Sequence, residues 1–270
     1  MRTQAISVPP TSADHWSCPV LGLDIGGTKL AVAVVTADGS IHGWQVEPTQ
    51  RERGPQDVIR RLFAMGHRAI AEAGPAQPVR AVGISCGGPL DARGGVLLRP
   101  FHLPGWIDVP LVAMAEAEFG LPAVLGNDAS AAVLAEHRHG AGRGLATVVY
   151  LTISTGVGGG LVFNHKLHHG AAGNGGELGH LTVQAGGRDC SCGRRGCLEA
   201  YCSGTSIARR GQEAVARAAA GGVHTSLAGL GEVTAADVAQ AAAAGDPVAA
   251  AVWSKTTDLL GQALTDLVNV

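Results

Sequence analysis

The chain has 270 residues, of which 46% are hydrophobic and 16% charged, and its formal net charge is -2. This length allows one large domain or two smaller ones, and the charge gives no reason to expect a nucleic acid or a membrane surface as a partner, because such sites usually carry a basic patch. The sequence has no apolar run that suits a transmembrane helix, and residues 1–19 lack the apolar core of a signal peptide, so we predict a disordered tail there and a cytoplasmic protein.

The first predicted elements are two strands joined by a glycine turn. The runs "LGLD" (21–24) and "LAVAVV" (30–35) should pair antiparallel, because the turn between them is too short for a helix. Apolar residues recur at helical spacing over 55–74, where Pro55 suits the first turn and Gly74 the end. Strand and helix then alternate, with strands within 79–88 and 122–128 and helices within 109–120 and 129–140. This alternation predicts an α/β protein in which helices cover a sheet.

The opening pattern returns about 125 residues later, which indicates an internal repeat. The stretch "ATVVYLTISTGVGGGLVFN" (146–164) again reads as strand, glycine turn and strand. We therefore predict two α/β domains, 20–125 and 126–270, each built around one such hairpin. The chain from Gly211 onward is predicted to be helical, with a break between two helices at Gly245-Asp246-Pro247.

Both glycine turns differ from the common phosphate-binding loops, because a strand rather than a helix follows each of them. Successive N–H groups in a tight glycine turn still form an anion-binding concavity, and the missing Cβ atoms let phosphate oxygens come close. A plain hairpin is the alternative for either turn. Because the pattern occurs once in each half, we favour a pair of hairpins that hold an oligophosphate.

Four residues have the chemistry and spacing of a zinc site. Cys190, Cys192 and Cys197 follow the pattern Cys-x-Cys-x4-Cys, and His180 lies ten residues before the first of them. Three thiolates and one imidazole fill the tetrahedral shell of Zn²⁺ and leave no open position, so the metal is predicted to be structural. The alternative is a set of reduced, buried thiols, but this stretch is polar and rich in glycine.

Several carboxylates suggest acid–base chemistry and sugar binding. Asp128 stands where a strand meets a helix, so it either caps the helix or acts as a general base that accepts a proton from a hydroxyl. Asn127 beside it can bond a second hydroxyl. Glu177 and Glu199 flank the predicted zinc ligands, so a metal that folds this loop would bring both glutamates towards one place. Carboxylates of this kind bind the hydroxyls of neutral polyols.

With these motifs the chain resembles the ROK family of sugar kinases, which have the actin-like ATPase (ribonuclease H-like) fold. The resemblance is carried, over roughly Val20 to Ser206, by "DIGGTK", "GGPLD", "LPGW", "GNDASAA", "STGVGGG", "GELGH" and "CSCGRRGCLE". It implies two α/β domains with a cleft between them. Members normally continue past "ALTDLVNV" into a strand and a glycine-rich turn that contacts adenosine, so we expect the second domain to lack its final part.

The resemblance also implies a role for individual residues. Asp128 corresponds to the base that deprotonates the sugar 6-hydroxyl. The phosphate loops correspond to Asp24, Gly26, Gly27, Thr28 and Lys29 in the first half and Thr155, Gly156 and Gly158 in the second. The sugar-binding residues correspond to Gly88, Asn127, Asp128, Glu177, His180 and Glu199, with His180 also on zinc. The implied cofactors are ATP, Mg²⁺ and Zn²⁺, the substrate is a hexose, and a homodimer is expected.

The resemblance leaves the sugar open. We expect a glucokinase-like enzyme, with N-acetylmannosamine kinase as the alternative, and polyphosphate in place of ATP is open as well. His102 stands where the family usually has Asn, which affects one sugar contact. A sugar-responsive repressor of the same family is disfavoured, because only about twenty residues precede the first glycine turn and a DNA-binding module needs helices and a basic face. The third alternative is a sugar-binding protein without catalytic activity.

Overall fold

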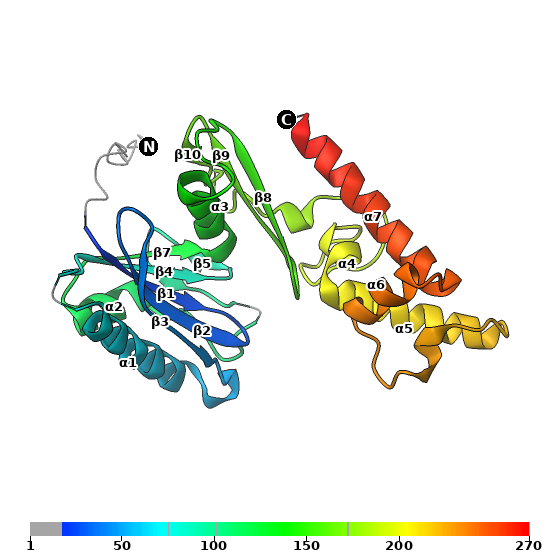
Figure 1. Cartoon of the computed structure of the whole chain (residues 1–270), viewed down its shortest axis with the longest axis horizontal. Helices are drawn as coiled ribbons and strands as arrows, with labels where there is room; N and C mark the ends of the chain where they lie inside the picture. The colour runs from blue at the N-terminus through cyan, green and yellow to red at the C-terminus, as the bar shows by residue number, and fades with distance from the viewer. Residues whose placement is uncertain (1–17, 75, 101, 172, 270) are drawn as a thin grey trace, which may run out of the picture. The chain divides into compact units, whose positions relative to one another are not determined.

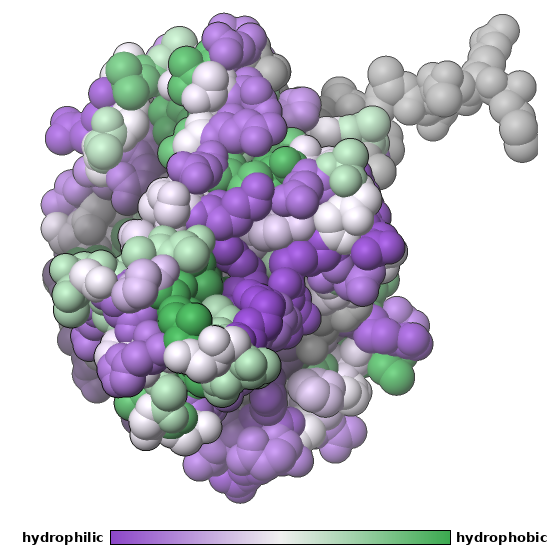
Figure 2. Space-filling view, turned by 90° about the vertical axis from the view of Figure 1, so that its right-hand side faces the viewer, coloured by the Kyte–Doolittle hydropathy of each residue, from purple (hydrophilic) through white to green (hydrophobic). Residues whose placement is uncertain are grey.

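The computed structural model describes residues 18–74, 76–100, 102–171 and 173–269. They belong to two compact units, Met1–Asp128 (unit 1) and Ala129–Val270 (unit 2). The predicted disordered tail lies outside the described residues, except for Cys18 and Pro19. No helix in the described ranges is both long and apolar enough to span a bilayer. On the face of the molecule drawn in Figure 2, hydrophilic residues surround small apolar areas, which is ordinary for a protein surface.

Unit 1 is built on a five-stranded sheet with the order β3-β2-β1-β4-β7 (Figure 1). Its strands are β1 (Val20–Ile25), β2 (Lys29–Val35), β3 (Ile41–Pro48), β4 (Ala81–Cys86) and β7 (Ala123–Asn127). The predicted antiparallel pairing of β1 with β2 is confirmed, whereas β1, β4 and β7 run parallel. The carboxyl ends of these three strands therefore meet at one edge, where Ile25 lies opposite Cys86 and Cys86 opposite Asn127.

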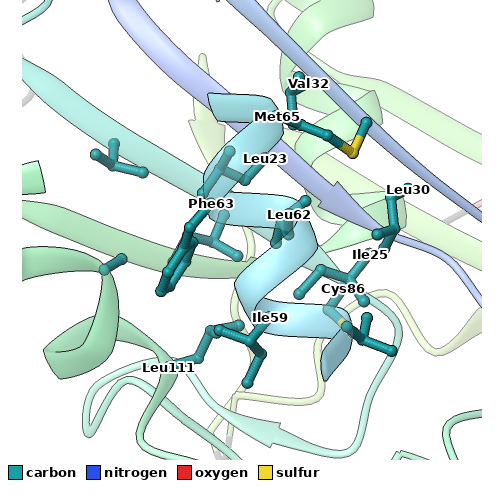
Figure 3. Close-up of a cluster of buried hydrophobic side chains, with 14 of the residues drawn as sticks. Leu23, Ile25, Leu30, Val32, Ile59, Leu62, Phe63, Met65, Cys86 and Leu111 are labelled. Atoms are coloured by element: carbon teal, nitrogen blue, oxygen red, sulfur yellow. The ribbon is translucent and has the colours of Figure 1, made fainter. Parts of the chain in front are cut away.

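Two helices, α1 (Pro55–Ala73) and α2 (Leu111–Phe119), pack on this sheet. As predicted, α1 has Pro55 in its first turn and ends at Gly74, whose φ of 75° suits glycine. Its buried side chains pack with those of the strands in one apolar core, which includes Leu23, Val32, Leu62 and Met65 (Figure 3). This core fixes the positions of the strand ends.

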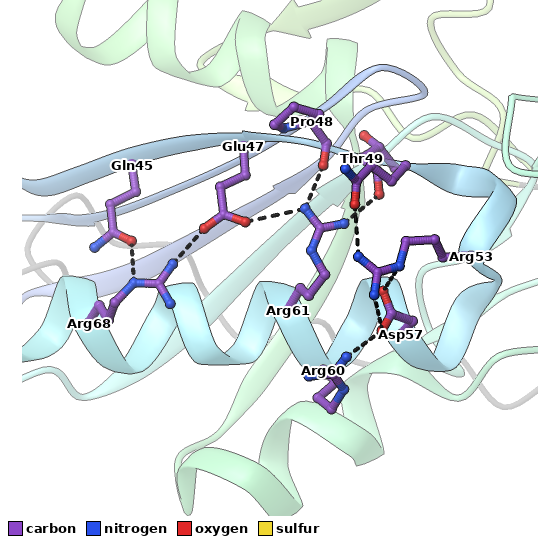
Figure 4. A network of polar contacts seen from close by, with 10 residues as sticks. Gln45, Glu47, Pro48, Thr49, Arg53, Asp57, Arg60, Arg61 and Arg68 are labelled. Atoms are coloured by element: carbon purple, nitrogen blue, oxygen red, sulfur yellow. Dashed lines mark hydrogen bonds and ion pairs between the residues drawn. The ribbon is translucent and has the colours of Figure 1, made fainter.

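Arginines on α1 also form ion pairs and hydrogen bonds with the edge strand β3 and the residue after it. Arg68 Nη2 and Arg61 Nη2 lie 2.7 Å and 3.2 Å from the Glu47 carboxylate (Figure 4), and Arg61 donates to the carbonyl oxygens of Pro48 and Thr49. Exposed ion pairs of this kind stabilise a protein by about 1 kcal/mol or less. The apolar core therefore contributes most to holding α1 on the sheet.

Unit 2 contains a three-stranded antiparallel sheet with the order β10-β9-β8. Its strands are β8 (Val148–Ile153), β9 (Val157–Phe163) and β10 (Lys166–Leu167). Helix α3 (Asp128–His139) packs on β9, where a Cβ at Gly160 would lie 2.6 Å from Val133 Cγ1. The remaining elements are η2 (Leu178–His180), α4 (Glu199–Cys202), α5 (Gly204–Ala220), η3 (Ser226–Gly229), α6 (Ala235–Ala243) and α7 (Pro247–Val268).

Some elements differ from the sequence prediction. Strand β3 and the short hairpin of β5 (Leu90–Asp91) and β6 (Val96–Leu97) were not predicted, and neither was η1 (Arg51–Arg53). Helix α5 begins at Gly204 rather than near Gly211, because the Ser203 side chain accepts the N–H of Ser206 and caps the helix there. The predicted break between two helices is confirmed, with Asp246 as the N-cap of α7.

Candidate active site and metal centre

A half-buried carboxylate lies at the shared edge of β1 and β4. Asp24 is the second-last residue of β1, and the parallel register places it opposite Ser85 of β4. The Ser85 hydroxyl donates a hydrogen bond to Asp24 Oδ1. Burial raises the pKa of Asp24; the bond from Ser85 lowers it in part, and the charge of Asp128 raises it further. The site therefore contains a carboxylate that is harder to ionise than an exposed one.

The first glycine turn joins β1 to β2, and hydrogen bonds to its backbone hold its conformation. The N–H of Gly26 donates to the Lys29 carbonyl oxygen at 3.0 Å. The fully buried Thr49 donates its hydroxyl to Gly26 O at 2.7 Å and its N–H to Thr28 O at 3.0 Å. Within the described ranges, no hydrogen-bond partner exists for the N–H groups of Gly27 and Thr28. The turn therefore presents two successive free donors, which is the arrangement that binds anions.

His102 packs between this turn and the glycines after β4. A Cβ at Gly27 would lie 3.1 Å from His102 Cβ, and a Cβ at Gly87 would lie 2.6 Å from His102 Cε1. The ring Nε2 is 3.8 Å from the Cys86 thiol. Burial lowers the pKa of His102, although the charge of Asp128 raises it in part. The His102 side chain therefore lies against Gly27 and Gly87, and a Cβ at Gly87 would displace its ring. Half-buried Gly88 follows Gly87 directly.

Asn127 and Asp128 complete this cluster in unit 1. Asn127 is the last residue of β7, and exposed Asp128 is the first residue of α3. The charge of Asp128 adds to the raised pKa of Asp24 and offsets part of the lowering of the His102 pKa. Two carboxylates, an imidazole and an amide therefore lie at the strand ends beside the first turn, contributed by β1, the loop at His102, β7 and the start of α3. At the edge where parallel strands end, α/β proteins commonly bind ligands.

The second glycine turn, in unit 2, repeats the pattern of free donors. Ser154 N–H donates to Gly156 O at 2.9 Å, whereas Thr155 and Gly156 have N–H groups without a partner in the part of the chain that the structure describes. The start of α5 holds this turn: Gly204 N–H donates to Ser154 O at 2.8 Å, and the Thr205 hydroxyl donates to Thr155 O at 2.9 Å.

Gly158, predicted from the resemblance to bind phosphate, lies inside β9. A Cβ there would be 3.0 Å from Thr152 Cγ2 and 3.3 Å from Ala129 Cβ. The close packing of β9 with its neighbours is thus one reason for glycine at this position, separate from any ligand.

The four predicted metal ligands come together in unit 2. The donor atoms of His180, Cys190, Cys192 and Cys197 all lie within 4.8 Å of one another. His180 Nδ1 is 3.7 Å from Cys190 Sγ, and the sulfur atoms of Cys192 and Cys197 are 3.8 Å apart. A tetrahedral zinc ion with Zn–S bonds of about 2.3 Å requires sulfur atoms about 3.8 Å apart. The residues therefore fit Zn²⁺ in geometry and in chemistry.

Backbone hydrogen bonds hold the metal-binding loop, which we define as residues 180–198. Leu198 N–H donates to Leu181 O at 2.8 Å, and Val183 N–H donates to Gly196 O at 2.9 Å. The Cys190 N–H donates to Arg194 O at 2.9 Å. Four cysteine and histidine side chains in such a loop would leave no coordination position for a substrate, as expected for a structural metal.

The two predicted sugar-binding glutamates lie at the borders of this loop. Glu177 is exposed and precedes η2, and its carbonyl oxygen accepts the His180 N–H at 3.0 Å. Glu199 begins α4; its Oε2 accepts the Val157 N–H at 3.0 Å, and its Oε1 accepts the Ser191 hydroxyl at 3.1 Å. The structure therefore places Glu199 against both the loop and the second glycine turn.

The predicted site residues thus form two groups, one in each unit. Unit 1 holds Asp24, Gly26, Gly27, Thr28, Lys29, Gly88, Asn127 and Asp128, and unit 2 holds Thr155, Gly156, Gly158, Glu177, His180, Cys190, Cys192, Cys197 and Glu199. Sequence reasoning missed the partners that position these residues: Thr49, Ser85, Ser191 and Thr205. A single hydroxyl side chain has no distinctive pattern in a sequence, so only the register and the fold identify these partners.

Comparison with known proteins adds a second line of evidence. A model of the ROK family matches residues 20–270. A glucokinase from Thermotoga maritima is 35% identical over 251 residues, which covers 93% of this chain and 78% of that protein. An N-acetylmannosamine kinase from Escherichia coli is 38% identical over 212 residues, or 78% of this chain and 70% of that protein. The crystal structure of a ROK family glucokinase from Streptomyces griseus in complex with glucose and AMPPNP is 33% identical and superposes with a TM-score of 0.72, covering 93% of this chain and 79% of that one.

Proposed function

Because the chain belongs to the ROK family and has its actin-like ATPase fold, we propose that it phosphorylates the 6-hydroxyl of a hexose with ATP, and that glucose is the hexose. The observation that carries the proposal is that, among the residues the structure describes, the successive N–H groups at Gly27-Thr28 and at Thr155-Gly156 have no hydrogen-bond partner. Turns that leave such donors unused suit an oligophosphate. A sugar kinase also accounts for the carboxylates beside them.

In the proposed reaction Asp128 is the general base. It accepts the proton of the sugar 6-hydroxyl while that oxygen attacks the γ-phosphorus of MgATP, so that an O–P bond forms and the bond to ADP breaks. The free N–H groups of the two turns stabilise charge on the phosphate oxygens, and Lys29, which is exposed at the end of the first turn, adds a positive charge. The Asp24 carboxylate is proposed to help hold the Mg²⁺ that binds together with ATP.

The hydroxyls of the sugar are proposed to bind Gly88, Asn127, Glu177, His180 and Glu199. His180 faces Cys190 with its Nδ1 atom, so a zinc ion would take that nitrogen and leave Nε2–H as a donor to the sugar. Zinc would supply folding energy and fixed ligand positions rather than chemistry. The proposed zinc site and sugar site would thus share one imidazole.

N-acetylmannosamine is the second candidate substrate, because a kinase for that sugar is 38% identical to this chain. The proposed sugar contacts bind hydroxyls that many hexoses share, so they do not select the group at the 2-position. A coupled assay with glucose, mannose and N-acetylmannosamine, each with ATP and with polyphosphate, tests the choice. Phosphorylation of N-acetylmannosamine but not of glucose would show that N-acetylmannosamine is the substrate.

The homodimer and the cytoplasmic location stay predictions.

The role of Asp128 is tested by the substitution Asp128→Asn, with Asp258→Asn on α7 as a matched control away from both turns. Loss of a general base lowers kcat by about 10²–10⁴-fold, while the amide keeps the size of the side chain. We expect this loss of kcat in Asp128→Asn, with the Kd for glucose changed by about twofold or less, and normal kcat in the control. Turnover by Asp128→Asn close to that of the wild type would exclude Asp128 as the base.

A further inference from the structure

Glu199 connects two features that the sequence separates by many residues. One carboxylate oxygen, Oε2, accepts the N–H of Val157, the first residue after the second glycine turn, at 3.0 Å. The other oxygen, Oε1, accepts the hydroxyl of Ser191 at 3.1 Å and lies 3.9 Å from the Cys190 thiol. The side chain thus spans from the glycine turn to the metal-binding loop.

The turn is shaped to receive this carboxylate. A Cβ at Gly156 would lie 2.7 Å from Glu199 Oε2, so a side chain at this position would displace the carboxylate from the turn. The base of the side chain is fixed as well, because Leu198 before it is fully buried and the Glu199 carbonyl oxygen accepts the Ser203 N–H at 3.2 Å. The backbone at Glu199 is therefore anchored, while its carboxylate contacts both the turn and the loop.

The hydrogen bonds of the second glycine turn indicate how Glu199 affects its N–H groups. Four successive N–H groups run from Ser154 to Val157. Ser154 donates to Gly156 O and Val157 donates to Glu199, while the N–H groups of Thr155 and Gly156 have no partner among the described residues. The two bonded groups flank the two free ones. Glu199 thus holds the exit of the turn in the conformation that leaves the central pair available to an anion.

From this geometry we infer that Glu199 is a positioning residue for nucleotide phosphate, and that it makes the phosphate-binding turn depend on the metal-binding loop. The inference rests on the proposed function and extends it, because Glu199 was assigned to the sugar alone. A carboxylate has room for both tasks, since each oxygen accepts more than one hydrogen bond. Disturbing the loop is then expected to weaken nucleotide binding even when no sugar is present.

The test separates nucleotide binding from sugar binding and from catalysis. We would measure the Kd of Mg²⁺-AMPPNP without sugar, the Kd of glucose without nucleotide, the zinc content, and the hydrogen-exchange rate of the Val157 amide by NMR. The variants are Glu199→Ala, Glu199→Gln and Ser191→Ala, with Glu232→Ala as the control for loss of an exposed carboxylate outside the loop and turn.

A hydrogen bond to a charged group contributes enough that its loss changes an equilibrium by about tenfold or more. In Glu199→Ala we expect a Kd for AMPPNP about tenfold higher and a Val157 amide that exchanges at least about tenfold faster. Glu199→Gln keeps an acceptor for Val157 and should restore most of both. Ser191→Ala, which removes only the contact with the loop, should give a smaller change in the same direction, and Glu232→Ala should give none.

Unchanged AMPPNP affinity and unchanged Val157 exchange in Glu199→Ala, with zinc retained, would overturn the inference and leave Glu199 as a sugar contact only. If Glu199→Ala loses zinc or does not fold, Ser191→Ala decides, because it leaves the carboxylate in place; no change in either measurement there would overturn the link to the loop. Absence of AMPPNP binding by the wild type would instead overturn the proposed function. Binding of AMPPNP without phosphorylation of any hexose would refute the kinase assignment and leave the positioning role intact.

Discussion

Two glycines of the metal-binding loop allow a matched test of how the loop is built. Gly193 and Gly196 both have positive φ, 84° and 82°, so alanine is strained at either position. Their surroundings differ. A Cβ at Gly193 meets nothing within 4 Å, whereas a Cβ at Gly196 would lie 1.8 Å from the Gln184 carbonyl oxygen and 2.8 Å from its carbon. The pair therefore separates backbone strain from steric exclusion.

The magnitudes follow from these contacts. The left-handed conformation costs an alanine about 1–2 kcal/mol, so Gly193→Ala should lower the unfolding free energy by that amount. At Gly196 the overlap is with backbone that cannot retreat, because Gln184 O accepts the Gly187 N–H and Gly196 O accepts the Val183 N–H, both at 2.9 Å. We expect a total loss of about 4 kcal/mol or more, in the range of the most damaging single substitutions.

Thermal unfolding and elemental analysis measure the difference. For a protein of this size, 1 kcal/mol corresponds to about 2–4 °C in Tm, so Gly193→Ala should unfold within about 8 °C of the wild type and keep about one zinc per chain. Gly196→Ala should unfold at least about 8 °C lower and lose most of the metal. Equal Tm and equal zinc content in the two variants would show that the close approach of residues 184 and 196 does not hold the loop together.

Three further predictions concern the metal, the start of α7 and the carboxylate of Asp24. Cys192→Ser should abolish zinc binding, whereas Cys202→Ser should keep the metal, because the Cys202 thiol donates to Thr256 O and is not among the four clustered ligands; equal zinc content by elemental analysis would contradict the site. Burial would raise the pKa of Asp246, but hydrogen bonds from Ala249, Ser226 and Thr225 hold it well below its usual range. Asp246→Ala should therefore lower the unfolding free energy, measured in urea, by about 2 kcal/mol at pH 7, because the helix cap is lost. This difference should shrink as the pH falls below about 4, where the carboxylate takes up a proton in the unfolded chain but stays ionised in the folded protein, and it should vanish below the lowered pKa of the folded protein. Burial raises the pKa of Asp24, so the neutral carboxyl is favoured in the folded protein, and its contribution to stability is lost as the pH rises through the raised pKa. In urea, Asp24→Asn should have the same unfolding free energy as the wild type near pH 4 and a higher one at pH 8, and it should lose kinase activity. A lower unfolding free energy than that of the wild type at pH 8 would refute this reasoning.

The sequence by itself determined the features that depend on residues close together in the chain. Apolar spacing located α1, and Pro55 and Gly74 located its ends, because a helix forms its hydrogen bonds between near neighbours. The cysteine spacing identified three ligands, since a short loop can bring them around one ion. The two glycine turns were visible for the same reason: a turn closes over a few residues.

Tertiary structure alone decided the features that join distant segments. The bond from Ser85 to Asp24 depends on the register of two parallel strands, β1 and β4. Two further strands and α1 separate them in the sequence, so no local pattern sets this register. Strand β3, which contains Gly43 and Glu47, is stabilised by pairing with β2 and by the arginines of α1. The contact of Glu199 with Val157 joins residues 42 positions apart. The sequence shows which chemical groups are present, but which oxygen meets which N–H follows from the packing of segments that approach one another only in the folded chain.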